Sequence, residues 1–300
     1  MNTPVLLLIF NRPDTTKIVF EQIRAAKPAR LFVSADGPRP GLADDHAHCT
    51  AARSVIKEID WDCKLETLFH DRNIGCKRAV SSAIDWFFAH VEEGIILEDD
   101  CVPDQSFFRY CQELLGHFRQ DTRVMQVCGS NLVGNRDVQD SYFFSRFGPV
   151  WGWASWRRAW QYYDVNMKLW PTIRDGNMVG AFTDSAEETR WRMRLYDQVY
   201  RQEIDTWDYQ WGFAKLVQSG LSVIPRENLI TNIGFHRSAT HTRKTPSYMT
   251  DLRRSELEFP LHHPAAVLRH AGLDSRYFRK VVHGGGLKAL LSRIFESPAR

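Results

Sequence analysis

Three consecutive carboxylates follow one of the most apolar stretches of the chain. In "EEGIILEDDCVPD", residues 92–104, an apolar triplet predicts a short buried strand, and Glu98, Asp99 and Asp100 come directly after it. Adjacent like charges repel, and a buried carboxylate is costly unless it is paired or binds a metal ion. Carboxylate oxygens suit Mg²⁺ or Mn²⁺, which commonly shares its coordination with substrate phosphates. We therefore expect a metal site here, with Asp100 as the direct ligand.

A purely structural role for these acids is the alternative. Carboxylates near a helix N-terminus commonly cap the helix, and we expect a helix to begin near residue 104. Residues 101–103 separate the acids from that helix, which favours the metal site.

A second carboxylate that could do chemistry is Asp208, in "TWDYQW", residues 206–211. It could act as the general base that takes a proton from an attacking hydroxyl group. Because Trp207 and Trp211 flank it, we expect their rings to line a sugar-binding site. The alternative is that Asp208 only caps the helix that follows it.

Polar residues also follow the other strands that we predict. Asn11 and Arg12 come after the first strand, Asp36 after the second, and residues 71–73 after the third. Ligands of parallel α/β sheets bind at the carboxyl ends of the strands, so these clusters predict one shared site. Asp36 could accept hydrogen bonds from a base or a ribose, or serve only as a turn residue. Arg12 and Lys77 could contact a diphosphate.

The elements that must position these residues alternate regularly. Apolar runs and helical periodicity predict strands at 5–10, 30–38, 63–71, 94–97 and 124–130, with helices at 15–27, 49–59, 77–91 and 106–118. This order predicts an α/β fold, with a mostly parallel central sheet flanked by helices. The later part predicts a helix at 184–201 and strands at 221–225 and 228–235. We expect one domain over residues 1–280, with halves 1–135 and 136–280, and a tail over 281–300.

Composition narrows the class of protein. The 300 residues are 43% hydrophobic and 25% charged, with a net charge of +3, which gives no reason to expect a nucleic-acid partner. The start is a poor signal peptide, and no apolar run reaches membrane-spanning length. The six cysteines form no C-x-x-C pair, so we expect free, buried thiols and a cytoplasmic location. Most of the ten tryptophans are expected in the core.

Two common nucleotide-binding motifs are absent from the sequence. No G-x-G-x-x-G follows the first strand, where Asn-Arg-Pro-Asp stands instead, and no P-loop is present.

In their order along the chain, these motifs resemble those of inverting GT-A glycosyltransferases, in particular N-acetylglucosaminyltransferase I-type enzymes and bacterial nucleotide-diphospho-sugar transferases. The resemblance spans residues 4–245, in the segments "VSADGP", "ILEDDCVPDQSFFRY", "GWASWRRAW", "TWDYQW" and "IPRENLITNIGFHRSATHT".

The resemblance implies a GT-A (Rossmann-like) fold with an acceptor-side lobe, and "GWASWRRAW" as a helix of that lobe. It implies metal-dependent transfer of a sugar of the N-acetylglucosamine type from a UDP-sugar to a glycan, lipid-linked or polysaccharide acceptor. Asp208 would be the base, Asp100 the ligand of Mn²⁺ or Mg²⁺, and Asp36 the uracil contact. The other donor-binding residues would be Phe10, Asn11, Arg12, Lys77, Glu98, Asp99, His236 and Arg237. The motif departs from the family at Tyr209, where a second acid is common, and this leaves the acceptor's identity open.

Two segments near the end of the chain could also contribute to function. Residues 234–248 could close as a lid over the diphosphate, using His236, Arg237, Arg243 or Lys244, or could be an exposed loop of no special role. An apolar helical face over 287–295 could lie on the inner membrane, although packing against the domain is favoured.

Two other functions stay open. A sugar nucleotidyltransferase would normally show a glycine-rich basic loop after the first strand. A non-catalytic carbohydrate-binding protein would leave the acidic triplet without a role.

Overall fold

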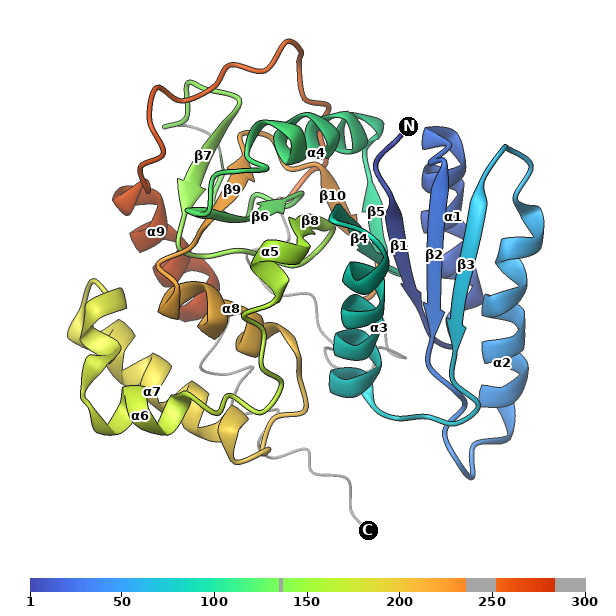
Figure 1. Ribbon diagram of the computed structural model, residues 1–300, viewed down its shortest axis with the longest axis horizontal. Coiled ribbons are helices and arrows are strands. Elements are labelled where there is room, and N and C mark those ends of the chain that lie inside the picture. The colour runs from blue at the N-terminus through green and yellow to red at the C-terminus, as the bar shows by residue number, and fades with distance from the viewer. Residues whose placement is uncertain (135–136, 236–251, 284–300) are drawn as a thin grey trace.

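The computed structural model describes residues 1–134, 137–235 and 252–283. Its centre is an eight-stranded sheet in the order β3-β2-β1-β4-β8-β6-β9-β7, which runs across the molecule in Figure 1. The strands are β1 (Val5–Ile9), β2 (Arg30–Ala35), β3 (Lys64–Phe69), β4 (Glu93–Glu98), β6 (Val124–Cys128), β7 (Tyr142–Ser145), β8 (Trp153–Trp156) and β9 (Leu221–Pro225). A small antiparallel sheet pairs β5 (Cys101–Pro103) with β10 (Ile230–Asn232).

The first four strands of the sheet run parallel, from β3 through β2 and β1 to β4. These strands are connected by α1 (Pro13–Ala26), α2 (Ala43–Ser54) with a 3₁₀ turn at Val55–Glu58, and α3 (Cys76–His90). Helix α4 (Gln105–His117) follows β5. The predicted α/β class and mostly parallel sheet are thus confirmed. The predicted second helix differs most, because α2 begins six residues before position 49.

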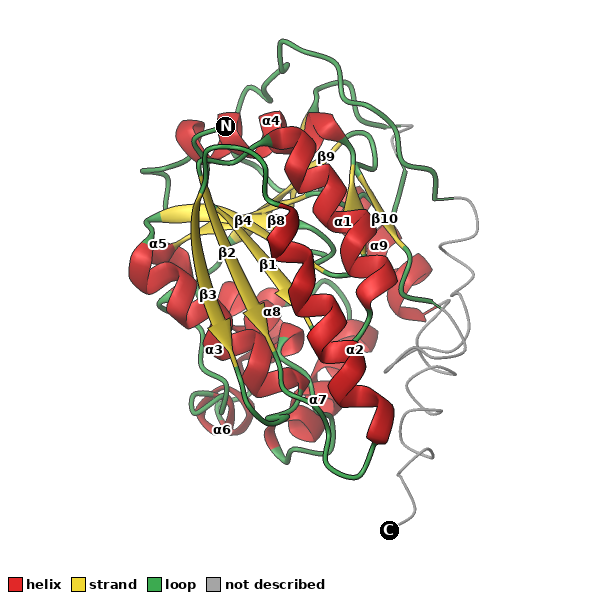
Figure 2. Cartoon of the chain, turned by 90° about the vertical axis from the view of Figure 1, so that its right-hand side faces the viewer, coloured by secondary structure: helices red, strands yellow, loops and turns green. Residues whose placement is uncertain are grey.

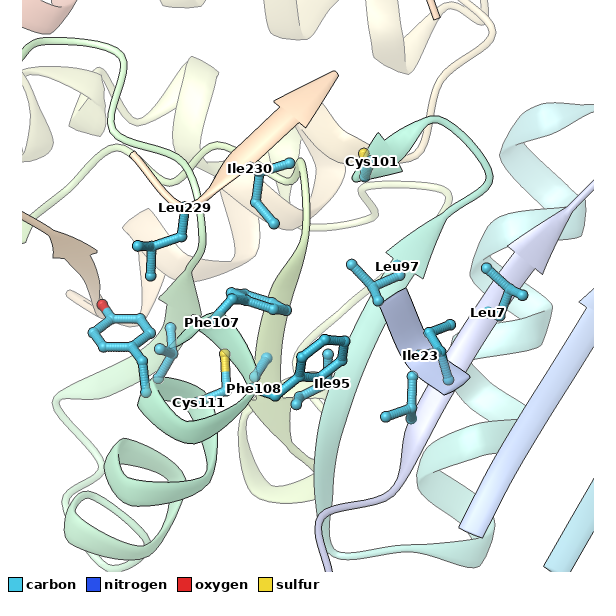
Figure 3. Close-up of a cluster of buried hydrophobic side chains, with 14 of the residues drawn as sticks. Leu7, Ile23, Ile95, Leu97, Cys101, Phe107, Phe108, Cys111, Leu229 and Ile230 are labelled. Carbon is cyan, nitrogen blue, oxygen red and sulfur yellow. The ribbon is translucent and has the colours of Figure 1, made fainter. Parts of the chain in front are cut away.

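Both faces of the sheet are buried, as its continuously apolar strands require. Alternate residues of β1 face opposite sides: Leu7 packs among residues of α1 and α4, whereas Leu6 packs among residues of α3 and α8 (Asp208–Val217). Figure 2 shows α1 and α2 on one side of the sheet and α3 on the other. Figure 3 shows the first of these clusters, where Phe107 and Phe108 of α4 meet strand residues such as Ile95.

The segment "GWASWRRAW" is a strand followed by a short helix, so the helix that the resemblance implied is wrong for its first half. β8 lies antiparallel between β4 and β6, and only Arg157–Trp160 form a short helix, α5. Trp153 and Trp156 are completely or almost completely buried. A buried run of four residues such as Trp-Ala-Ser-Trp is too short to show a periodicity that separates strand from helix.

Beyond the sheet lies a helical lobe with its own buried cluster. It is built from α6 (Trp170–Asp175), a 3₁₀ turn at Met178–Phe182, α7 (Ala186–Tyr200) and one face of α8. Trp170, Tyr196 and Phe213 meet edge to face in its core. The predicted helix at 184–201 is confirmed as α7. The described chain then continues to α9 (Ala271–Tyr277) and a π-helical turn at Phe278–His283.

The prediction that the cysteines are free is confirmed, whereas the prediction that they are buried holds for four of the six. All six cysteines are free thiols, four of them buried. Within the described residues, no helix is both long enough and apolar enough to cross a membrane.

Candidate functional site

The acidic triplet lies where β4 ends, beside the end of β1. Because β1 and β4 are paired in parallel with Leu8 opposite Glu98, the residues after each strand meet at the same edge. Arg12 forms ion pairs with both Asp99 and Asp100, at 2.9 Å from its Nη1 to Asp100 Oδ2. Asp99 is 3% exposed and also accepts a 3.3 Å hydrogen bond from the Phe10 backbone N–H.

The acids do not cap α4, so that alternative is excluded. Asp104 caps the helix, accepting a 2.9 Å hydrogen bond from the Ser106 backbone N–H and a 2.7 Å bond from the Ser106 hydroxyl.

The three carboxylates of the triplet lie beside one arginine, Arg12, and two of them have raised pKa values. Burial, then the charges of Asp100 and Asp99, raise the pKa of Glu98 to about 8. Burial also raises the pKa of Asp99 to about 6, and Arg12 offsets this shift only partly. Among the described residues, no hydrogen-bond donor pairs with the Glu98 carboxylate. Burial at this edge therefore disfavours the charged forms of Glu98 and Asp99.

Strand β10 packs closely over this edge. The Ile233 N–H donates to the Asp100 backbone oxygen at 2.8 Å. A Cβ placed on Gly234 would lie 2.1 Å from Asp100 Oδ2 and 3.0 Å from Arg12 Nη1. Only glycine fits against the ion pair at this position.

Asp36 lies buried at the end of β2, where its carboxylate fixes the neighbouring loop. It accepts hydrogen bonds from the Gly37 N–H at 2.8 Å, the Ile74 N–H at 3.0 Å and Asn73 Nδ2 at 2.8 Å. The residue thus ties the loop after β3 to the end of β2. A uracil contact at Asp36 remains a prediction.

Asn11 and Phe10 lie beside an ion pair, Arg39–Asp45, that sequence reasoning missed. Asn11 Nδ2 donates to Asp45 at 2.8 Å, and Arg39 binds both oxygens of Asp45 at 2.6 and 2.8 Å. The Arg39 guanidinium also lies 5.4 Å from the centre of the Phe10 ring. Asp45 and Arg39 fall in a charged stretch with no motif, so only the fold brings them to the end of β1.

Asp208 begins α8 without capping it. Trp207 occupies the N-cap position, no side chain caps that turn, and Asp208 accepts a hydrogen bond from the Thr206 hydroxyl. The expectation that Trp207 and Trp211 line a sugar site is wrong. They are only 4% and 1% exposed and pack against Trp153 in the core.

Carboxylates from the ends of two strands and from the start of α8 influence the same thiol at this edge. Burial, then the charges of Glu98, Asp208, Asp205 and Asp36, raise the pKa of the Cys76 thiol at the start of α3. The Asp208 charge also contributes to the raised pKa of Glu98. The fold therefore gathers the three predicted acidic positions around the first turn of α3.

Lys77, in that first turn, is half-buried. Gly75 precedes the helix with φ 85°, a left-handed conformation that favours glycine, and no side chain caps the turn. Backbone N–H groups at such a start attract anions. This arrangement supports the expected phosphate contact, which stays a prediction.

The donor set fits a cation that shares its ligands with a substrate. Within residues 1–134, 137–235 and 252–283, no three His, Cys, Asp or Glu side chains converge to hold a metal ion by themselves. Mg²⁺ and Mn²⁺ are typically bound by one or two carboxylates together with phosphate oxygens. Asp100, which also pairs with Arg12, and Glu98 beside it are two such carboxylates.

Several predicted residues lie outside the described part of the chain. These are His236, Arg237, Arg243 and Lys244 of the expected lid, and the tail helix at 287–295.

Comparison with known proteins identifies no family. No family model and no curated protein matches the chain. Mouse xyloside xylosyltransferase 1, apo form, matches with a TM-score of 0.35 and 11% identity over 72% of this chain and 81% of its own. HddC from Yersinia pseudotuberculosis matches with a TM-score of 0.32 and 10% identity, over 52% and 77% of the two chains. UDP-glucose pyrophosphorylase complexed with UDP-glucose matches with a TM-score of 0.32 and 7% identity, over 54% of this chain and 79% of its own. At TM-scores this low, the likeness says nothing about this chain's substrate.

Proposed function

We propose that this chain is an inverting, metal-dependent glycosyltransferase. It transfers a sugar of the N-acetylglucosamine type from a UDP-sugar to a glycan, lipid-linked or polysaccharide acceptor. The observation that carries this proposal is the gathering of Asp36, Glu98 and Asp208 around the first turn of α3, at the carboxyl edge of the sheet. Ligands of parallel α/β sheets bind at that edge.

The donor half of the site comes from the ends of β1, β2 and β4. Phe10, Asn11 and Asp36 are the residues proposed to bind the nucleoside. Arg12 and Lys77 are the cations proposed to face the diphosphate, and His236 and Arg237 would add to them. Arg12 already holds Asp99 and Asp100, so it also fixes the acidic edge against which the diphosphate lies.

Mg²⁺ or Mn²⁺ would be held by Asp100 with Glu98 beside it, and would supply positive charge for the departing diphosphate. What supports this assignment is the placement of two carboxylates, Glu98 and Asp100, at the end of β4, where a divalent ion could share its ligands with the diphosphate.

Asp208 is the proposed general base. The acceptor hydroxyl oxygen bonds to the anomeric carbon on the face opposite the diphosphate, and the bond to the diphosphate breaks. Asp208 takes the hydroxyl proton, and UDP leaves with the bonding electron pair. A single displacement of this kind inverts the anomeric carbon. One Asp208 oxygen is held by Thr206, while the other makes no hydrogen bond within the described residues and is free to accept the proton.

UDP titration by calorimetry, with and without Mn²⁺, tests the donor half. UDP binding should strengthen with Mn²⁺, and Asp100→Asn should remove that increase. The matched control is Asp104→Asn, which alters a nearby acid that caps α4. Metal-independent UDP binding would contradict the proposal, and absence of UDP binding would favour the carbohydrate-binding alternative.

A UDP-sugar panel with Mn²⁺, assayed for release of UDP, tests the chemistry. Asp208→Asn should lower kcat about 100- to 10,000-fold while UDP still binds. Release of pyrophosphate from a nucleoside triphosphate and a sugar phosphate would favour the nucleotidyltransferase alternative instead.

A further inference from the structure

The hydroxyl group of Thr206 donates to one oxygen of Asp208, two residues further along the chain. Among the described residues, the Asp208 side chain makes no other hydrogen bond. A carboxylate side chain at the first turn of a helix can rotate among several rotamers. A donor fixed at one of its oxygens selects one rotamer and thereby aims the other oxygen.

Thr206 is itself held from α8. The Gln210 side-chain Nε2 donates to the Thr206 backbone oxygen at 2.6 Å, and Gln210 is only 1% exposed. This bond reaches from the first turn of the helix back to the residue before its cap. It fixes the backbone at Thr206, and so the place from which the hydroxyl points.

Trp207, between Thr206 and Asp208, is also fixed in place, through its backbone and its ring. The Tyr163 hydroxyl donates to its backbone oxygen at 3.2 Å, and its ring stacks on Trp153 at 5.8 Å between centroids, with a 20° angle between planes. The buried Trp207 ring anchors the segment to the sheet. Asp208 is thus presented by a rigid segment, and one hydroxyl group sets its direction.

We propose that Thr206 is a positioning residue for Asp208, and that Gln210 acts through Thr206. Thr206 keeps its own proton throughout: its hydroxyl donates to Asp208 Oδ1, and the substrate proton goes to Asp208 Oδ2. The proposal rests on the proposed function, because it takes Asp208 as the base.

The kinetic test measures UDP release from UDP-N-acetylglucosamine with Mn²⁺ by the full chain. Thr206→Val, which removes the hydroxyl at nearly constant volume, should lower kcat about 10- to 100-fold, the effect expected for one hydrogen bond to a charged group. KM should stay within about twofold, because Thr206 aims the base and does not bind the donor. Thr206→Ser, which keeps the hydroxyl, should stay close to the wild type.

Thr183→Val is the matched control, because Thr183 donates to the Val179 backbone oxygen in the helical lobe, away from Asp208. It should leave kcat unchanged. Equal losses in Thr206→Ser and Thr206→Val, or no loss in either, would overturn the proposal.

A double-mutant cycle tests the part played by Gln210. Gln210→Met should also lower kcat at constant KM. The double variant with Thr206→Val should be no slower than Thr206→Val alone, because both changes act through one contact. Additive losses would show that Gln210 acts by another route and overturn its part of the proposal.

Crystal structures of the wild type and the two Thr206 variants give a readout that needs no activity. The Asp208 carboxylate should keep its rotamer in Thr206→Ser and leave it in Thr206→Val; an unchanged rotamer in Thr206→Val would overturn the proposal. Failure of the proposed function looks different, since Asp208→Asn would then retain its rate of UDP release.

Discussion

Arg12 is the residue on which the acidic edge depends, because its guanidinium contacts both Asp99 and Asp100. Two carboxylates of the triplet are therefore fixed by one side chain that follows the neighbouring parallel strand, β1. Removing one partner of a buried ion pair leaves the other charge in a poorly solvated place. The arginine is thus a structural requirement of the site, in addition to any contact with a diphosphate.

Arg12→Met should therefore lower the free energy of unfolding by about 2–3 kcal/mol, the cost of losing hydrogen bonds to a buried charge. Urea denaturation of both proteins measures this. The control is Lys17→Met, which removes a half-exposed cation paired with Glu21 and Glu58 and should cost less than about 1 kcal/mol. Equal losses in the two variants would mean that the pairs at Asp99 and Asp100 stabilise no more than a surface pair.

At the scale of elements, α8 carries Asp208 at its first turn and is docked at its other end by Lys215. This lysine is 1% exposed, and its Nζ donates to the Ser222 hydroxyl of β9 at 2.6 Å and to the Gln126 side chain of β6. Burial lowers the pKa of Lys215 to about 8, because the charged form loses its hydration.

This burial predicts a pH dependence of stability. The unfolded-state pKa is about 10.4, so between pH 8 and that value the unfolded chain holds the proton at Lys215 and the folded chain does not. Stability then rises with pH across this window, by up to about 3 kcal/mol relative to Lys215→Met. Urea denaturation of both proteins at pH 7.5 and pH 10 measures the change.

Lys168→Met serves as the control for Lys215→Met, since Lys168 is exposed and its replacement removes the same charge from solvent. The buried-lysine explanation fails if the wild type gains nothing over Lys215→Met at the higher pH.

Two glycines in neighbouring elements should respond to alanine in opposite ways. A Cβ on Gly94 in β4 would lie 2.3 Å from Phe87 Cζ and 2.9 Å from the Pro4 oxygen, whereas one on Gly116 in α4 meets nothing within 4 Å. Gly94→Ala should destabilise by about 1–3 kcal/mol through overpacking. Gly116→Ala should stabilise by about 0.5–1 kcal/mol through helix propensity. Thermal denaturation compares them, and a stabilised Gly94→Ala protein would disprove the close packing.

The sequence predicted those helices and strands that a local pattern of apolar residues marks. Among the strands after β4, β6 and β9 were predicted, but β8 was not. It is four residues long, and its neighbours in the sheet come from residues 93–98 and 124–128. The acidic triplet and Asp208 could be singled out as carboxylates beside apolar or aromatic runs. Other contacts join residues more than thirty positions apart, and no periodicity in the sequence predicts them. Examples are the hydrogen bonds from Asn11 to Asp45 and from Asn73 to Asp36.

At the scale of the whole molecule, the thiols report on how completely the chain is packed. All six cysteines are free; Cys63 and Cys76 are partly buried, and the other four are buried. In the native protein, a thiol reagent such as DTNB should react quickly with at most these two, and with all six in denaturant. Cys63→Ser should lose one fast-reacting thiol. Rapid reaction of more than two native thiols would contradict the packing of the core.

Strand β8 has a consequence for how the polypeptide can be divided. It fills the place between β4 and β6, although both of those strands precede it in the chain. A fragment ending at residue 134 would leave β4 and β6 with unpaired backbone edges in the middle of the sheet, open to self-association. The fragment 1–134 and the rest of the chain should form a native-like complex when they are co-expressed. Neither fragment should be recovered as a native-like protein when it is produced alone.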